Sequence, residues 1–183
     1  LKDRTKFNLK VAGMEYLIET NLVARFNIYN LLAAIAAMNS QGIAMTQMLP
    51  YLKDIKQVEG RMQRIDEGQP FNVVVDFAHT PDGIEKVCKY ASEITPKGKR
   101  IIAITGSAGK RDTIKRPIFG QILDKYTDMI ILTEDDPRNE NPKDIAESIA
   151  SGIQSTNYVI IVDRYAAIRE AVEMADPNDT III

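Results

Sequence analysis

Short apolar runs alternate with longer segments of helical periodicity from residue 71 to the end of the chain. The apolar runs predict strands at 71–77, 100–105, 129–133, 158–162 and 180–183, and the segments between them predict helices at 81–94, 117–126, 142–152 and 165–175. A run without polar alternation, such as Ile-Ile-Ala-Ile at 101–104, is typical of a strand covered on both faces of its sheet. Because strand–helix alternation produces parallel strands joined by right-handed crossovers, we predict an α/β fold with a doubly wound, mostly parallel sheet.

Residues 1–59 follow a different pattern. Apolar and polar residues roughly alternate over 7–19 around Gly13, which predicts a β-hairpin or a pair of edge strands. Residues 24–38 have helical periodicity and are followed by Gly42, a typical helix stop, and 46–55 predict a short second helix. We therefore expect two regions that meet near residue 60. Since the chain starts at Leu1 and stops inside the apolar run at 180–183, we also expect a longer parent protein.

Charge and cysteine content argue against several classes of function. With 23 basic and 25 acidic residues the net charge is −2, which is unlike the basic excess of nucleic-acid-binding proteins. The single cysteine, Cys88, excludes an intrachain disulfide framework and a cysteine-rich zinc site, and it fits a reducing cytoplasm. No apolar run approaches the ~20 residues that a membrane span needs. We expect no nucleic acid, no membrane and no metal site for this chain.

The segments that follow the predicted strands are the first candidates for a site, because ligands gather at the carboxyl ends of parallel strands. Residues 76–82 (Asp-Phe-Ala-His-Thr-Pro-Asp) contain the only histidine of the chain. Asp76 can accept hydrogen bonds from ribose hydroxyls, and His79 can donate one to a phosphate. The alternative is that Thr80 and Asp82 cap the next helix while His79 orders the turn.

The second strand is followed by Thr-Gly-Ser-Ala-Gly-Lys-Arg-Asp at 105–112. Its spacing differs from a Walker A loop, which has four residues between its glycines and a Ser or Thr after the lysine. Glycines permit turns in which backbone N–H groups converge on an anion, and arginines bind carboxylate or phosphate through paired hydrogen bonds. The alternative is a simple glycine turn with solvated charges. The candidate anion loop comprises Gly106, Gly109, Lys110 and Arg116, with Arg111 beside it.

Acidic residues and an arginine follow the third strand, at 134–142 (Glu-Asp-Asp-Pro-Arg-Asn-Glu-Asn-Pro). Arg138 can bind the carboxylate of an amino acid and an aspartate can bind its ammonium group. The alternative is a hydrophilic loop whose Asn141 caps the next helix. Arg61, at the junction of the two regions, is placed where an arginine can reach across a domain cleft.

Together these segments resemble one family. Gly-Arg-Met at 60–62, the 76–82 segment, the 106–112 segment with Lys-Arg-Pro at 115–117, and Asp-Asp-Pro-Arg at 135–138 occur in the order and spacing of the ATP-dependent Mur ligases, and within them of the MurE type. Phe-Asn-Ile-Tyr-Asn at 26–30 before an alanine-rich helix is similar to the end of the family's central ATPase domain. The resemblance covers essentially the whole chain. It implies that 1–59 form the tail of that ATP-binding domain and that 60–183 form a Rossmann-like C-terminal domain, incomplete at its end.

The resemblance implies amide ligation in peptidoglycan synthesis. ATP would activate a carboxylate of UDP-N-acetylmuramoyl-dipeptide as an acyl phosphate, and a free dibasic amino acid, diaminopimelate or lysine, would attack it. The implied enzyme is cytoplasmic and monomeric and uses ATP and Mg²⁺, but its phosphate-binding loop and metal ligands lie outside this chain, which is expected to be inactive alone. For the nucleotide, the resemblance implies that Asn30 contacts the adenine, Asp76 the ribose, Arg61 the terminal phosphate and His79 the phosphate side. It implies that the amino acid is bound by Arg111, Asp136 and Arg138. Arg61 and His79 are the implied catalytic residues.

Two departures keep alternatives open. Asp136 stands where many diaminopimelate-adding members have asparagine, and Lys110 stands where the family commonly has an acid or a small polar residue. Arg138 favours a substrate with a distal carboxylate, whereas a second acid favours an ammonium such as that of lysine. The rival functions are another amide ligase of the superfamily, of the poly-glutamate or cyanophycin type, and a non-catalytic module that binds a nucleotide or acidic metabolite. The ligase hypothesis requires the turns after residues 77, 105 and 133 to meet on one rim, facing the segment of Asn30.

Overall fold

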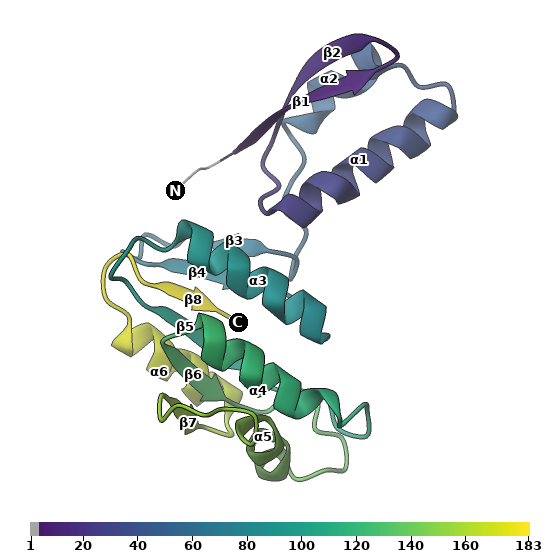
Figure 1. Ribbon diagram of the computed structural model, residues 1–183. Coiled ribbons are helices and arrows are strands. Elements are labelled where there is room, and N and C mark those ends of the chain that lie inside the picture. The colour runs from purple at the N-terminus through teal and green to yellow at the C-terminus, as the bar shows by residue number, and fades with distance from the viewer. Residues whose placement is uncertain (1–3) are drawn as a thin grey trace. The chain divides into compact units, whose positions relative to one another are not determined.

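The computed structural model describes residues 4–183 as two compact units, divided between Met62 and Gln63 (Figure 1). Each unit has its own hydrophobic core and is considered separately. The assignment of the two units to domains of a longer protein stays a prediction.

The first unit is a β-hairpin packed with two helices. Strands β1 (Thr5–Val11) and β2 (Met14–Thr20) pair antiparallel, and both residues of the connecting turn, Ala12 and Gly13, have positive φ. Such a turn matches the twist of a hairpin, so the predicted hairpin is confirmed. Helices α1 (Arg25–Ser40) and α2 (Met45–Leu52) follow. The core of this unit comprises Ile18 of the hairpin, Leu31 and Ile35 of α1, and Met45, Met48 and Leu52 of α2.

The second unit is built on a six-stranded sheet of order β3-β4-β8-β5-β6-β7. All neighbours pair parallel except the edge strand β3, which is antiparallel to β4, so the predicted α/β fold with a mostly parallel sheet is confirmed. The last strand of the chain lies in the middle of the sheet, between β4 and β5 (Figure 1). The strands are β3 (Gln63–Ile65), β4 (Asn72–Val75), β5 (Ile101–Thr105), β6 (Met129–Leu132), β7 (Tyr158–Ile160) and β8 (Thr180–Ile182).

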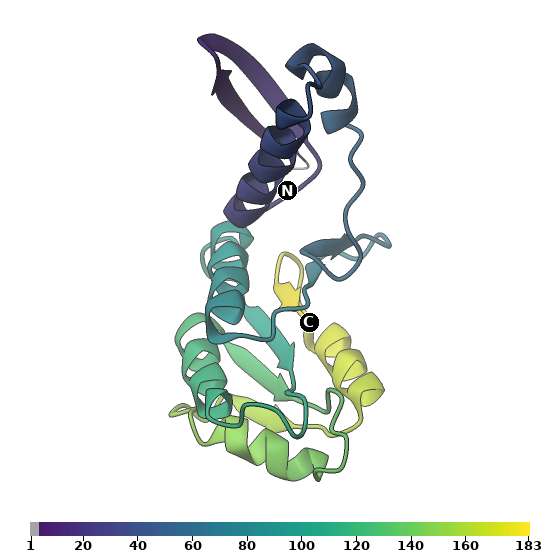
Figure 2. The ribbon, with the colours of Figure 1, turned by 90° about the vertical axis from the view of Figure 1, so that its right-hand side faces the viewer.

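Helices cover both faces of this sheet. Figure 2 shows α6 on the face opposite to α3 and α4. Beneath α6, Ala167 and Ala171 form a buried cluster with isoleucines of the sheet, such as Ile102 and Ile131. Among residues 4–183, no helix combines the length and the apolar character that a membrane span requires. The helices are α3 (Pro81–Ile94), α4 (Lys115–Tyr126), α5 (Pro142–Ala150) and α6 (Arg164–Met174).

Two glycines let α4 and α5 approach closely. A Cβ on Gly120 of α4 would lie 2.2 Å from the carbonyl oxygen of Ile149, and one on Gly152, just after α5, would lie 1.8 Å from that of Pro117. Real Cβ atoms essentially never approach other atoms so closely, so the two helices can meet this tightly only with glycine at both positions.

An ion pair between a buried aspartate and a half-exposed arginine lies at the amino edge of the parallel strands. Asp179, which precedes β8, is 1% exposed and accepts hydrogen bonds from the backbone N–H of Arg100 (2.9 Å) and from that of Asp176 (3.0 Å). The guanidinium of Arg100 pairs with the same carboxylate at 2.8 Å. Burial opposes ionisation, but these donors outweigh it and hold the pKa of Asp179 below its ordinary value. The charged form therefore stabilises the edge of the sheet.

Candidate functional site

Four loops follow the carboxyl ends of parallel strands and therefore share one edge of the sheet. We name them after their strands: the β4 loop (76–80), the β5 loop (106–114), the β6 loop (133–141) and the β7 loop (161–163). Hydrogen bonds join these loops. Glu134 N–H of the β6 loop donates to the carbonyl of Val162 in the β7 loop at 3.1 Å, and the side chain of Lys115, just after the β5 loop, donates to the carbonyl of His79 in the β4 loop at 2.8 Å. The expected meeting of the turns after residues 77, 105 and 133 on one rim is thus confirmed within this unit.

Two glycines allow the β5 and β6 loops to touch through their backbones. A Cβ on Gly106 would lie 2.5 Å from the carbonyl oxygen of Thr133, and one on Gly109 would lie 2.0 Å from that of Pro137. The N–H of Gly109 donates to the carbonyl of Asp136 at 3.0 Å. The sequence predicts that these glycines form an anion-binding turn. The structure shows a second requirement for glycine at both positions, which is the close packing of the β5 loop on the β6 loop.

An ion pair between Arg116, in the first turn of α4, and Glu140 of the β6 loop adds to the contact between the two loops. Arg116 is 4% exposed; its guanidinium pairs with Glu140 Oε2 at 2.8 Å and donates to the carbonyl of Ala108 at 3.3 Å. The other carboxylate oxygen of Glu140 accepts the backbone N–H of Lys110. The hydrogen bond from Arg116, followed by that from Lys110, lowers the pKa of Glu140 to about 2, so the carboxylate is ionised at neutral pH.

Arg116 differs here from the prediction based on its sequence position. The sequence predicts Arg116 as part of a candidate anion loop, but its guanidinium is buried and bonded to Glu140 of the β6 loop and to Ala108 of the β5 loop. Its Nε and the Oγ of Ser107, both buried, have no hydrogen-bond partner among the residues described. The exposed cations of this edge are instead Lys110 and Arg111 on the β5 loop and Arg138 on the β6 loop.

The residues predicted to hold an amino acid lie on these two bonded loops. Arg111, Asp136 and Arg138 are exposed, and Arg138 Nε pairs with Asp136 Oδ2 at 3.2 Å. Asp136, Arg138 and Lys110 all have positive φ, at 44°, 52° and 53°. Non-glycine residues rarely adopt this conformation, and such residues cluster where a ligand is held. The two loops therefore present two arginines and a carboxylate, a set that suits a ligand with both carboxylate and ammonium groups.

The β4 loop carries the residues predicted to contact a nucleotide. His79 is exposed, its Nδ1 lies 3.2 Å from the carbonyl of Phe77, and its ring meets the Phe77 ring edge-on at 5.4 Å. Asp76 is half-buried, and its backbone N–H donates to Ile183. The alternative reading of this loop is partly confirmed, since Thr80 caps α3 by accepting from Gly83 N–H at 3.1 Å. Thr80 is thus the residue that caps α3. The contacts of Asp76 with a ribose and of His79 with a phosphate stay predictions.

The alternative reading of the β6 loop is also partly confirmed. Asn141 caps α5 by accepting the N–H of Lys143 at 3.0 Å. Asp136 and Arg138 take no part in that cap, so the loop can both start a helix and hold a ligand.

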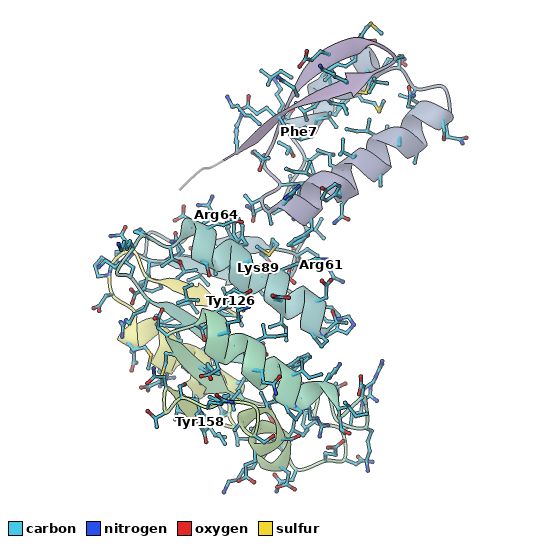
Figure 3. The ribbon with its side chains drawn as sticks, viewed as in Figure 1. Phe7, Arg61, Arg64, Lys89, Tyr126 and Tyr158 are labelled. Atoms are coloured by element: carbon cyan, nitrogen blue, oxygen red, sulfur yellow. The ribbon has the colours of Figure 1, made fainter. Side chains whose placement is uncertain are left out.

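Asn30 and Arg61 belong to the first unit. Asn30 lies on α1 and donates to Asn27 at 3.2 Å, and Asn27 in turn donates to the carbonyl of Val23. Arg61 lies on the segment between α2 and β3, and its N–H donates to the carbonyl of Val58 (Figure 3). The predicted contacts of Asn30 with adenine and of Arg61 with a phosphate stay predictions.

Sequence reasoning missed Glu140 and Lys115. In the sequence, Glu140 is one more acid in a hydrophilic loop, and Lys115 is one of several basic residues before a helix. Only the folded chain brings Glu140 to Arg116 and to the backbone of Lys110, 30 residues away, and Lys115 to the carbonyl of His79.

The residues of the β4 loop fit a nucleotide, whereas no cluster of metal ligands occurs among the residues that the structure describes. An aspartate and an exposed histidine beside a helix that starts with Pro81 suit the sugar and phosphates of a nucleotide. Residues 4–183 contain no group of three or more His, Cys, Asp or Glu side chains placed to hold a metal ion. The location of the Mg²⁺ ligands outside this chain, which the resemblance implies, stays a prediction.

Known proteins share the sequence and the architecture. Residues 60–183 match the family described as Mur ligase, glutamate ligase domain. The chain is 40% identical over 181 residues (98% of the chain, 37% of the relative) to UDP-N-acetylmuramoyl-L-alanyl-D-glutamate--2,6-diaminopimelate ligase 1 of Clostridium acetobutylicum. It is 39% identical over 184 residues (99% of the chain, 37% of the relative) to the ligase of the same name, without a number, from Syntrophomonas wolfei. The chain thus spans about 37% of the length of these curated relatives.

Solved structures give the same picture. A structure of a UDP-N-acetylmuramoyl-L-alanyl-D-glutamate--2,6-diaminopimelate ligase is 32% identical with a TM-score of 0.64, covering 97% of the chain and 36% of that protein. A pseudomurein peptide ligase type C from Methanothermus fervidus is 25% identical with a TM-score of 0.77, covering 98% of the chain and 37% of that protein.

Proposed function

Since the chain belongs to the Mur ligase family, we propose that its protein is an ATP-dependent ligase that adds diaminopimelate or lysine to UDP-N-acetylmuramoyl-dipeptide. The observation that carries this proposal is the placement of Arg111, Asp136 and Arg138 on two loops bonded to each other at the carboxyl edge of the sheet. The names of the relatives, which are diaminopimelate ligases, favour diaminopimelate over lysine. The nucleotide substrates of such a reaction favour a cytoplasmic enzyme, and we propose that it acts as a monomer.

The amino acid is held by charge complementarity. Diaminopimelate carries a carboxylate and an ammonium at each end. Arg138 and Asp136, paired at 3.2 Å, offer one partner for each group of one end, and Arg111 on the facing loop offers a partner for the carboxylate of the other. Lysine has no distal carboxylate and would leave one arginine without a ligand partner. Because these contacts fix the amine that attacks, they lower the barrier by orientation.

The nucleotide is assigned to the β4 loop and to the first unit. ATP, when bound, supplies the phosphoryl group that activates the dipeptide carboxylate. Asp76 accepts hydrogen bonds from the ribose, His79 donates to the phosphates, and Asn30 contacts the adenine. Arg61 stabilises the negative charge that develops on the terminal phosphate during transfer. Transfer of the phosphoryl group to the carboxylate would release ADP. The amine then attacks the carbonyl carbon, the bond from that carbon to the phosphate oxygen breaks, and an amide, phosphate and a proton result.

Phosphate release by the complete gene product tests the proposal. The protein is mixed with ATP and, in separate reactions, with meso-diaminopimelate, L-lysine or no amino acid. Each reaction is run with UDP-N-acetylmuramoyl-dipeptide, with no acceptor, and with a folate or a glutamate peptide and glutamate as the alternative substrates. We expect release that depends on both the acceptor and one of the two amino acids. If no reaction releases phosphate although the protein binds ATP in a separate titration, the proposal is refuted and a non-catalytic module is favoured. Release only with a folate or glutamate acceptor would favour another ligase.

Substitution of Arg138 separates the amino-acid site from the nucleotide site. Arg138→Ala should raise the KM for the amino acid at least tenfold, since a charged hydrogen-bond partner is lost, and leave the KM for ATP nearly unchanged. An equal loss of affinity for both would contradict the assignment of Arg138.

A further inference from the structure

We propose that Glu140 and Arg116 are positioning residues that hold the β5 and β6 loops together and thereby set the affinity for the incoming amino acid. This inference rests on the proposed function, because it concerns the loops that carry Arg111, Asp136 and Arg138. Neither residue needs to touch the substrate.

The carboxylate of Glu140 connects the two loops directly. One of its oxygens accepts the backbone N–H of Lys110, the residue before Arg111, and the other pairs with Arg116 at 2.8 Å. Glu140 itself follows Arg138 by two residues, and its own N–H donates to the carbonyl of Pro137 at 3.0 Å. A single side chain thus fixes the distance between the backbone beside Arg111 and the backbone beside Arg138.

The contacts of Arg116 and Gly109 restrain the same stretch of the β5 loop. The guanidinium of Arg116 donates to the carbonyl of Ala108 at 3.3 Å, and Gly109 N–H donates to the carbonyl of Asp136 at 3.0 Å. With the bond from Lys110 to Glu140, three consecutive residues of the β5 loop are each tied to a fixed partner. Lys110 has a φ of 53°, a conformation that persists only where the surrounding structure enforces it. The loop therefore depends on these partners to keep its shape.

Loss of either charge would move the loops. Arg116 is 4% exposed, so without the Glu140 carboxylate its charge would be buried without a counter-ion. A buried charge that loses its partner is strongly unfavourable, and the least costly response is for the loops to open and admit water. Displacement of positioning groups by about 1 Å can cost an enzyme about 100-fold in rate. If the two loops part, Arg111 and Arg138 can no longer bind the charged groups of one amino acid together, so its affinity falls as well. We therefore expect the effect on the amino acid to exceed the effect on the nucleotide, which is assigned to the β4 loop.

The test compares Glu140→Gln with a matched control in the complete gene product. The control is Asp179→Asn, because Asp179 also pairs with an arginine at 2.8 Å and accepts backbone N–H groups, but lies at the amino edge of the sheet. The KM for meso-diaminopimelate or L-lysine, whichever the wild type uses, the KM for ATP and the Tm are measured for each protein. We expect Glu140→Gln to raise the KM for the amino acid at least tenfold, because charged hydrogen bonds to the amino acid are lost, with the KM for ATP nearly unchanged. Asp179→Asn should lower the Tm and leave both KM values unchanged.

Arg116→Lys is the second variant and keeps the test decisive if Glu140→Gln does not fold. Lysine retains the charge, but its single ammonium group cannot bond Glu140 and Ala108 as the two terminal nitrogens of the guanidinium do. We therefore expect the KM for the amino acid to rise less than in Glu140→Gln. An unchanged amino-acid KM in either folded variant would overturn the positioning role, and so would an equal rise in Asp179→Asn. A wild type without amino-acid-dependent phosphate release would instead refute the proposed function, so the two failures are distinguishable.

Discussion

Replacement of Gly109 by alanine tests whether close packing of the two loops builds the site. The added Cβ would lie 2.0 Å from the carbonyl oxygen of Pro137 and 2.7 Å from its carbonyl carbon. Both of these are backbone atoms, which cannot rotate away as the end of a flexible side chain can. The β5 and β6 loops must therefore separate.

The size of the effect follows from the contacts that this separation breaks. Ordinary contact begins near 3.4 Å, so the loops must part by about 1.4 Å, which breaks the 3.0 Å hydrogen bond from Gly109 to Asp136. Overpacking costs about 1–3 kcal/mol and a lost hydrogen bond about 0.5–1.5 kcal/mol, so we expect a loss of roughly 2–4 kcal/mol. For a unit of this size the Tm should fall by roughly 8–15 °C.

Gly120→Ala is the matched control for this variant. Its Cβ would lie 2.2 Å from the carbonyl oxygen of Ile149, so the clash is similar, but it lies between α4 and α5 and not between the loops. Thermal unfolding should show a comparable loss of Tm for both variants. Steady-state kinetics of the complete gene product should show a raised amino-acid KM for Gly109→Ala alone. A Gly109→Ala protein with the Tm and KM of the wild type, or an equal rise of KM in Gly120→Ala, would refute the reasoning.

Three further predictions concern ionisable groups. Because Arg116 lowers the pKa of Glu140 from 4.5 to about 2, the carboxylate stabilises the folded state above about pH 4.5, and this contribution is lost as the pH falls towards 2. Melting curves of wild type and Glu140→Gln should therefore differ at pH 7 and converge over that window; a constant difference would argue against the ion pair. Asp179→Asn should lower the free energy of unfolding in urea by about 2–3 kcal/mol. The loss is smaller than for a fully buried ion pair because Arg100 is half-exposed. An unchanged urea midpoint would show that the pair contributes nothing to stability. Burial, and then the charge of Glu85, raises the pKa of the Cys88 thiol to about 12, so an aromatic disulfide reagent at pH 8 should label the protein only after denaturation. Rapid labelling of the folded protein would mean that the thiol is accessible.

Elements with local signals were predicted most accurately. The starts of α3 and α5 follow from Thr80-Pro81 and Asn141-Pro142, in which a capping side chain and a proline act within one turn. Pro117 predicts that α4 starts at residue 117, but the helix begins at Lys115, where no side-chain cap marks it. The first predicted strand of the sheet extended to residue 77, whereas β4 ends at Val75. Asp76 and Phe77 therefore lie in the β4 loop and not in the strand.

Elements that depend on distant partners were missed or left unplaced. The edge strand β3 has three half-buried residues, Gln63–Ile65, too few to produce a periodic signal. The apolar run at 180–183 predicts a strand, but nothing local indicates that β8 lies between β4 and β5. Strand order is set by which neighbours bury the apolar faces, and this depends on the whole chain.

The amino-acid sequence alone determined the strand–helix alternation, the hairpin and the motifs that contain Arg111, Asp136 and Arg138, because these depend on neighbouring residues and on the family they resemble. The tertiary structure decided which residues support them. It brought Glu140 to Arg116 and to the backbone of Lys110, and it explained Gly109 by the approach of another loop. Contacts between loops 30 residues apart depend on the strand order and on exact backbone separation, and neither is recorded in the local pattern of residues.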